Sequence, residues 1–240
     1  MFDRLLKDTT FVIFDIETTG FDPIQDQIIE IGAVKMDYNG NIIDSFSRFI
    51  KLYKKETLPE KIIELTHITD TMLIEEGEEH ELVICDFFNF AKDAILVAQN
   101  AKFDMSFLAA YNIQNFNTTY SRVCLDTINF AKALKPNQES YRLSELVNMF
   151  NVEYDKDAHH RADYDAKITA KVLLNQIKQL SLSEDRCIRD LVMKENAPII
   201  TEKQNSFLES LLDKKSITLS EDTYFNKQIA SVHIDILLKI

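Results

Sequence analysis

The stretch FVIFDIETTG, residues 11–20, joins a short apolar run to two acidic side chains. Its apolar residues are contiguous rather than alternating, which is typical of a strand covered on both faces. Side chains two residues apart leave a strand on the same face, so Asp15 and Glu17 share one site. Two like charges at the end of a buried strand repel each other unless cations compensate them. The stretch predicts a central strand with a metal-binding carboxylate pair; the alternative is a solvated strand end.

Further strands are expected on both sides of this stretch in the sequence. Residues 27–36 and 41–50 are rich in β-branched side chains and flank a turn-forming cluster, which predicts an antiparallel hairpin. An irregular stretch follows, and helical spacing of apolar residues predicts a helix after His80. Residues 95–98 and 122–125 are expected to form short strands, with Asn100 as the N-cap of a helix over 103–111.

The remaining chain is predicted to be helical, with helices at 126–134, 142–150 and 162–179. Strands in a meander, followed by strands alternating with helices, indicate an α/β domain with one mixed sheet over residues 1–180. We place a linker at 181–199. A helical tail follows at 200–240, where Thr201 and Gln204 form a capping box before a helix at 202–214, and a second helix covers 227–239. This tail packs on the domain or on itself.

Composition restricts the class of protein further. The 240 residues include only 4 Gly and 4 Pro, so most of the chain is expected to be ordered. The formal charge of −12 repels nucleic acid, so local cations or metal ions must hold such a ligand. Three widely separated cysteines fit a reducing cytoplasm, and no run is long enough to span a membrane or serve as a secretion signal. We expect a soluble, cytoplasmic protein.

Two later segments carry acidic residues at helix starts. Asp104, in the segment AQNAKFD, falls in the first turn of the helix after the strand at 95–98, which is also a common position for a structural aspartate. The segment HHRADYD, residues 159–165, precedes another helix, and His160 converges with Asp165 only if His160 lies in the loop before that helix. Paired histidines next to acids are otherwise a frequent surface feature.

Together, in this order, the three segments resemble the DnaQ-like (DEDDh) 3′–5′ exonucleases. The similarity extends to IIEIGAV at 28–34 and LDT at 125–127, while residues 64–73 and 159–165 resemble the proofreading domain of type-C bacterial polymerase III. The resemblance implies a ribonuclease H-like fold whose five-stranded mixed sheet has three antiparallel and two parallel strands. No polymerase sequence accompanies it, so we expect a free-standing, epsilon-subunit-like relative.

The resemblance also implies the catalytic roles. His160 deprotonates the attacking water, because it is the histidine with four residues between itself and Asp165; the tyrosine subgroup would need a tyrosine where Arg161 stands. Oxygen-rich carboxylate sites suit hard cations. The implied ligands of two Mg²⁺ or Mn²⁺ ions are Asp15, Glu17, Asp104 and Asp165.

The resemblance assigns the turn after the first strand to the terminal nucleotide, with the backbone near the 3′-hydroxyl and Phe21 against the base. The implied substrate-binding residues are Thr18, Thr19, Gly20, Phe21, Ile68, Asn100 and Phe103. Relatives commonly have His at the position of Gln99 and Gly at that of His67, so substrate handling is where this chain should differ. Lys51, Lys54, Lys55 and Lys61 form a local basic group that either contacts phosphates or belongs to a solvated loop.

The expected activity is metal-dependent hydrolysis of terminal phosphodiesters in single-stranded or frayed DNA, releasing nucleoside 5′-monophosphates during proofreading or repair. One alternative is a 3′–5′ exoribonuclease that acts on RNA ends. Another is a non-catalytic subunit. In either case a DNA polymerase or another replication protein could dock on residues 200–240, a segment that resembles small helical modules of DNA-metabolism proteins.

Overall fold

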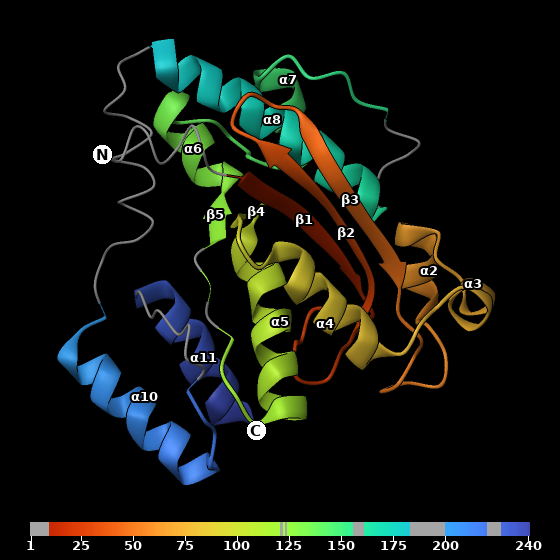
Figure 1. The fold of residues 1–240 in the computed structure, drawn as a ribbon, viewed down its shortest axis with the longest axis vertical. Helices are drawn as coiled ribbons and strands as arrows, with labels where there is room; N and C mark the ends of the chain where they lie inside the picture. The colour runs from red at the N-terminus through yellow and green to blue at the C-terminus, as the bar shows by residue number, and fades with distance from the viewer. Residues whose placement is uncertain (1–9, 121, 123, 156–160, 183–199, 220–226) are drawn as a thin grey trace.

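A mixed five-stranded sheet with the order β3-β2-β1-β4-β5 forms the centre of the protein (Figure 1). The computed structural model describes residues 10–120, 122, 124–155, 161–182, 200–219 and 227–240. β1 pairs antiparallel with β2 and parallel with β4, so the stretch expected to form a central strand does so. β3 continues the antiparallel half and β5 the parallel half. The strands are β1 (Thr10–Thr18), β2 (Ile28–Asp37), β3 (Ile42–Phe49), β4 (Ile95–Ala98) and β5 (Cys124–Asp126).

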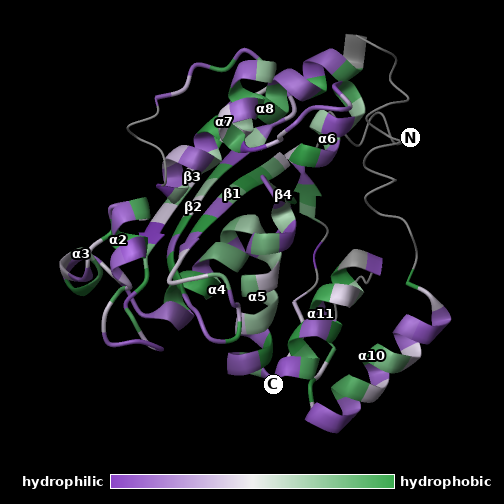
Figure 2. Cartoon of the chain, turned by 180° about the vertical axis from the view of Figure 1, so that it is seen from behind, coloured by the Kyte–Doolittle hydropathy of each residue, from purple (hydrophilic) through white to green (hydrophobic). Residues whose placement is uncertain are grey.

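Helices cover both faces of this sheet because β1 is apolar on both sides. Val12 and Phe14 pack in one buried cluster with α4 and α5, whereas Phe11 and Ile13 pack in another with α6 and α8. The strands in the middle of the sheet are accordingly mostly hydrophobic in Figure 2. The fold class predicted from sequence is confirmed. The helices of these layers are α4 (His80–Ala91), α5 (Ala101–Phe116), α6 (Thr127–Leu134), α7 (Leu143–Met149) and α8 (Ala162–Leu182).

Two short helices occupy the segment that was expected to be irregular. α2 (Glu60–Thr66) and α3 (Asp70–Glu75) are each too short to show a clear periodic pattern in the sequence. They are held by tertiary packing, since their Ile62 and Leu73 are buried in one cluster with Ile29 of β2. The last strand also differs from its prediction, because β5 runs over Cys124–Asp126 rather than 122–125.

The tail helices α10 (Glu202–Lys215) and α11 (Lys227–Lys239) pack on each other and on α5 (Figure 1). Both alternatives for the tail therefore hold, and the predicted capping box of Thr201 and Gln204 is present. Most of the predicted linker, at 183–199, lies outside the described residues, and the domain boundaries stay predictions. None of the described helices is long and apolar enough to cross a membrane. The apolar cluster that α10 and α11 share with α5 contains Ala109, Ala110, Ile113, Leu208, Leu211, Leu212, Ala230, Val232, Ile236 and Leu237.

Candidate active site

Three carboxylates meet where β1 passes under the start of α8. Asp15 and Glu17 continue the face of β1 that carries Phe11 and Ile13, the face that packs on α8. Asp165 lies in the first turn of α8. One carboxylate oxygen from each of the three residues lies within 4.8 Å of the other two, so the cluster could hold a divalent metal ion.

Asp104 reaches the same site from α5. It lies in the first turn of that helix, where its side chain is 2% exposed. All four carboxylates border one open cleft of about 780 Å³, although Asp104 is not part of the tight three-residue cluster. The lining of the cleft also includes residues of α6, α7 and the loop between them. Its other lining residues are Ile16, Gln99, Asn100, Phe103, Ile128, Lys132, Tyr141, Arg142, Leu143 and Ser144.

The carboxylates destabilise one another's charged forms. Burial raises the pKa of Asp15 well above its usual value, and the negative charges of Asp104 and Glu17 raise it further. Burial and the neighbouring Glu30 raise the pKa of Glu17 in the same way, and burial raises that of Asp104. Such a group is stable as carboxylates only when cations join it. The chemistry of this donor set therefore fits hard divalent ions.

The start of α8 is held against β2 by Glu30, a residue to which the sequence analysis gave no role. The Glu30 side chain is 1% exposed and accepts hydrogen bonds from the Arg161 guanidinium at 2.9 Å and the Ala162 amide at 3.1 Å. Next to it, a Cβ added to Gly32 would lie 2.1 Å from the backbone of Ala162 and Asp163. These contacts set the position of Asp165. The sequence feature that could have indicated a role for Glu30 is that it is the single charged residue within the apolar run IIEIGAV.

Asn100 occupies the N-cap position of α5, as predicted, but it does not cap the helix with its side chain. That side chain makes no capping hydrogen bond, and the Asn100 backbone is left-handed, with φ 61°. Instead, the Asp126 carboxylate at the end of β5 accepts hydrogen bonds from the amides of Asn100 at 3.0 Å and Ala101 at 3.2 Å. It also caps α6 through the Ile128 amide at 2.9 Å. The side chain that caps α5 thus belongs to β5, and the sequence around Asn100 gives no indication of this contact.

The turn after β1 is built by its own polar side chains. The Thr18 hydroxyl donates to the Gly20 carbonyl at 2.6 Å, and the Thr19 hydroxyl donates to Asp26 at 3.2 Å. A Cβ on Gly20 would lie 2.3 Å from the Asp26 carboxylate, so a larger residue here would displace that carboxylate from its contacts with the turn. The two threonine side chains thus face the protein, which leaves the backbone of the turn as the group available to a ligand.

Two aromatic rings flank the site beyond this turn. The Phe21 side chain is 77% exposed, and its ring lies 6.3 Å from that of Phe103 in an edge-on arrangement. Phe103 lines the cleft, as does Asn100. A large apolar side chain with this exposure is available for stacking on a base. The proposed contact of Phe21 with the terminal nucleotide stays a prediction.

Other predicted residues lie elsewhere. His160 falls outside the described residues, so its role as base stays a prediction. Ile68 is fully buried in the cluster beneath α2 and α3, and packing is the role its surroundings support. Asp163 pairs with Lys167 on α8 at 2.8 Å, so it does not join the carboxylate cluster.

The predicted basic group is largely occupied by contacts within the protein. The Lys54 amine donates to the carbonyls of Ile24 at 2.9 Å and Asp26 at 3.0 Å. Lys55 pairs with the Asp26 carboxylate, and Lys51 pairs with Glu79 at 3.1 Å. These lysines stabilise the loop around the turn rather than presenting free charge.

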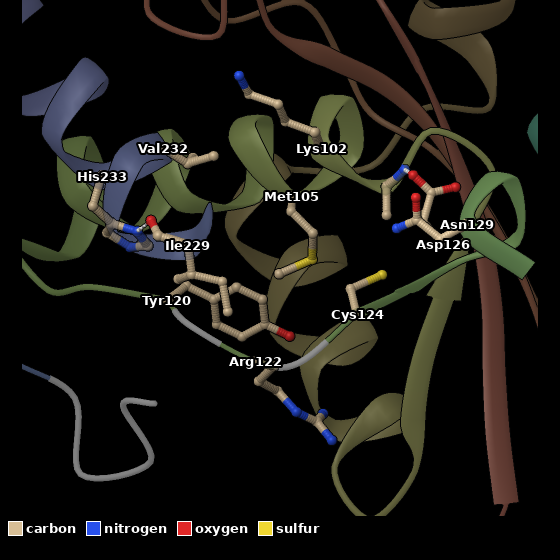
Figure 3. Close-up of a pocket in the computed structure, with 11 residues that line it drawn as sticks. Lys102, Met105, Tyr120, Arg122, Cys124, Asp126, Asn129, Ile229, Val232 and His233 are labelled. Carbon is tan, nitrogen blue, oxygen red and sulfur yellow. Dashed lines mark hydrogen bonds between the residues drawn. The ribbon is translucent and has the colours of Figure 1, made fainter. Parts of the chain in front are cut away.

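A second, small cavity of about 40 Å³ lies between the first turns of α5 and the helix α11 (Figure 3). Met105, Tyr120 and Val232 form much of its wall. His233 of α11 is 1% exposed there, and its Nδ1 donates to the Ile229 carbonyl at 2.9 Å. Burial lowers the pKa of His233 to about 4.

We expect His233 to make the tail acid-sensitive. Between about pH 6.5 and pH 4 the unfolded chain binds a proton at this histidine and the folded chain does not. The contribution of His233 to the free energy of unfolding is therefore fully present above pH 6.5 and is lost as the pH falls below that value. Urea unfolding should show wild type losing about 2 kcal/mol more than His233→Gln between pH 7.5 and pH 5. Parallel pH dependence of the two proteins would contradict this.

A sequence profile described as Exonuclease (RNase T) matches residues 12–173, a span that includes all four carboxylates of the cleft. The chain belongs to the Exonuclease family. Family membership supports a nuclease enzyme, and the acidic cluster makes divalent-metal binding plausible for this member.

Curated relatives extend the family assignment. The chain is 41% identical over 179 residues to the PolC-type DNA polymerase III of Staphylococcus aureus, and proteins of that name from several strains of the species match equally. The match covers 74% of this chain and 12% of that polymerase, so the chain resembles one small part of a much longer protein.

Solved structures show the same fold. An Escherichia coli exonuclease I complex with single-stranded DNA superposes with TM-score 0.61 at 20% identity, over 73% of this chain and 41% of that one. Exonuclease X bound to duplex DNA with a 5′ overhang gives TM-score 0.55 at 23% identity, over 71% and 93%. A 3′-exonuclease described as recognising the histone mRNA stem-loop gives TM-score 0.61 at 18% identity, over 71% and 64%. The ribonuclease H-like exonuclease fold is thereby confirmed.

Proposed function

We propose that the protein is a DEDDh-type 3′–5′ exonuclease that removes nucleoside 5′-monophosphates from single-stranded or frayed DNA, in proofreading or repair. The convergence of Asp15, Glu17, Asp104 and Asp165 on one cleft carries this proposal. The 41% identity to a part of a PolC-type DNA polymerase III favours DNA as the substrate.

The four carboxylates are proposed to hold two Mg²⁺ or Mn²⁺ ions. When bound, such ions supply Lewis-acid stabilisation of the attacking and leaving oxygens. The raised pKa values of Asp15 and Glu17 support this proposal, since burial and repulsion favour added cations and the nearby Arg161 is already engaged by Glu30. The protein's own task is to hold these oxygens in place and to position the 3′ end between the turn at residues 18–21 and Phe103.

His160 is proposed to accept the proton of the attacking water. It directly precedes Arg161 in the sequence, and Glu30 ties Arg161 to β2 next to the start of α8, the helix that carries Asp165. We expect His160→Ala to lower kcat by about 10²- to 10⁴-fold, the usual range for a general base, while Mn²⁺ binding measured by calorimetry persists. His159→Ala is the matched control. Equal loss in both variants, or full turnover in His160→Ala, would exclude the role.

Exoribonuclease activity is the second candidate. The structural similarity to a 3′-exonuclease described with histone mRNA indicates that this fold occurs in proteins that recognise RNA. RNA and DNA ends differ at the 2′-hydroxyl, so matched RNA and DNA strands distinguish the two candidate functions.

The deciding experiment is digestion of 5′-labelled DNA and RNA strands of identical sequence, with Mg²⁺ or Mn²⁺, alongside Asp15→Asn. Shortening of DNA from the 3′ end that is absent in the variant is the expected result. Shortening of RNA alone would replace DNA by RNA as the substrate. No metal-dependent cleavage of either strand would overturn the exonuclease proposal in favour of a non-catalytic subunit.

A polymerase or another replication protein is proposed to dock on the tail at 200–240. The similarity to part of a polymerase III supports a replication partner, and α10 and α11 leave Phe207 47% and Leu238 60% exposed. Substituting Phe207 by Ser tests this in a pull-down with a purified PolC-type polymerase. Equal retention of the variant and wild type would reject docking through this side chain.

A further inference from the structure

Several described cationic side chains in this half of the protein already have partners. Arg161 binds Glu30, Lys55 binds Asp26, and Lys54 is held by backbone carbonyls. A nucleic-acid strand brings one negative charge per nucleotide to a protein whose net charge is −12. Ions held by the carboxylates would serve the phosphate that is cut, but not the phosphates of the preceding nucleotides.

Two cations in the lining of the cleft form no salt bridge in the described part of the chain, although burial raises the pKa of Asp126 and the charge of Lys132 partly offsets that rise. Lys132 of α6 and Arg142, which precedes α7, both line the cleft that contains the four carboxylates, and both are exposed. Neither forms a salt bridge with a described carboxylate. The Arg142 side chain is not used to cap α7 either. Both side chains are therefore accessible to a ligand in the cleft.

The loop between α6 and α7 contacts the first of these cations and contains the second. Tyr141 directly precedes Arg142 in the sequence, and the Lys132 amine lies 5.6 Å from the Tyr141 ring centroid. The Tyr141 hydroxyl donates to the Lys135 carbonyl at 2.9 Å. The Gln99 side chain donates to the Tyr141 carbonyl at 3.0 Å, which ties this loop to the segment that precedes α5. Gln99 is the residue that replaces the histidine common in relatives, and here it fixes the loop that contains Arg142.

We propose that Lys132 and Arg142 bind the phosphates immediately upstream of the scissile bond, with Gln99 as a positioning residue for the loop that contains Arg142. The proposal rests on the proposed function, because it assumes a strand whose 3′ end lies at the carboxylates. These contacts explain how an acidic protein could bind the nucleotides of a strand that precede its 3′-terminal nucleotide. Arginine and lysine side chains in solvent make contacts of this kind with phosphates.

The first test measures binding without cleavage. In the Asp15→Asn background, fluorescence anisotropy with a labelled oligothymidylate is followed over a range of salt concentrations. Adding Lys132→Gln and Arg142→Gln should raise Kd about tenfold, the effect of weakening binding by about 1.4 kcal/mol. The slope of log K against log salt should become shallower by about 0.7 for each phosphate that the variant no longer binds.

The matched control is Lys203→Gln with Lys214→Gln, an equal change of charge on exposed positions of α10. A slope and Kd equal to those of this control would overturn the proposal. This arm decides the proposal even if the wild-type protein cleaves nothing, in which case the exonuclease proposal fails separately.

The second test separates upstream phosphates from the one that is cut. The p-nitrophenyl ester of thymidine 5′-monophosphate carries only the phosphate at the reacting centre. The ratio of kcat/KM for the oligonucleotide to kcat/KM for the ester should fall about tenfold in the Lys132→Gln, Arg142→Gln protein. An unchanged ratio with both activities reduced would place these residues at the reacting phosphate and overturn the assignment.

Discussion

Asp15→Asn is expected to abolish nuclease activity and at the same time stabilise the protein. The half-buried carboxylate of Asp15 lies near Asp104, Glu17 and Asp165, and its pKa is raised by desolvation first and by those charges next. Removing one negative charge relieves this repulsion, but it also removes a carboxylate from the cluster with Glu17 and Asp165 that we propose as a metal site. Function and stability therefore make opposite demands at this position.

The expected loss in kcat is about 10³-fold or more, since metal-assisted stabilisation of the transition state is worth several kcal/mol. In EDTA we expect the variant to be more stable by about 1 kcal/mol, a rise in Tm of about 2–4 °C for a chain of this size. Adding Mn²⁺ should raise the Tm of wild type, because an ion that binds the folded state stabilises it, and should raise that of the variant less.

Asp163→Asn is the matched control for this prediction. Asp163 lies on the same helix turn as Asp165 but pairs with Lys167 outside the carboxylate cluster. The control should keep its activity and its thermal response to Mn²⁺. If Asp15→Asn retained activity, or if it were no more stable than wild type in EDTA, the cluster would not be the repulsive metal site described here.

Gly32→Ala is expected to reduce activity through the position of a helix rather than through chemistry. The added methyl group would lie 2.1 Å from the carbonyl carbon of Ala162 and the amide of Asp163, so the start of α8 must move away from β2. That movement strains the Glu30 contacts to Arg161 and Ala162 and carries Asp165 with it. A displacement of about 1 Å in a catalytic group can cost about 10²-fold in rate.

We expect kcat to fall about 10²-fold and stability to fall by about 1–3 kcal/mol, the usual cost of overpacking. Gly77→Ala provides the control, because a Cβ there would lie 2.2 Å from the Leu73 carbonyl, and neither Gly77 nor Leu73 lines the cleft. That variant should lose stability without a matching loss of kcat. Equal kcat values for the two variants, measured at a temperature where both are folded, would rule out a specific role of Gly32 in placing Asp165.

Local sequence patterns predicted many of the strands and helices. The alternation of side chains along β1 placed Asp15 and Glu17 on one face, and the apolar run around them predicted a strand covered on both sides. The capping box at Thr201 and the helix beginning at His80 were likewise readable from neighbouring residues. Short-range rules worked because they concern contacts within one strand or one helical turn.

Contacts between distant segments were not readable in this way. Asn100 has the residue type of an N-cap, yet its backbone is left-handed and Asp126 supplies the cap. Helices α2 and α3 form because Ile62 and Leu73 find a core beside Ile29, not because of their own periodicity. Ile68 was expected at the substrate and is buried in that same core.

The sequence by itself determined the central strand, the order of the strands and of the longer helices, and the four acidic residues that line the cleft, because each follows from periodicity, a turn or a family motif. Only the tertiary structure decided which groups surround those acids: Glu30 and Gly32 beneath α8, Asp126 beneath α5, and Lys132 and Arg142 in the lining of the same cleft. The physical reason is that electrostatic compensation and close packing act through space, between residues as much as 132 positions apart in the chain.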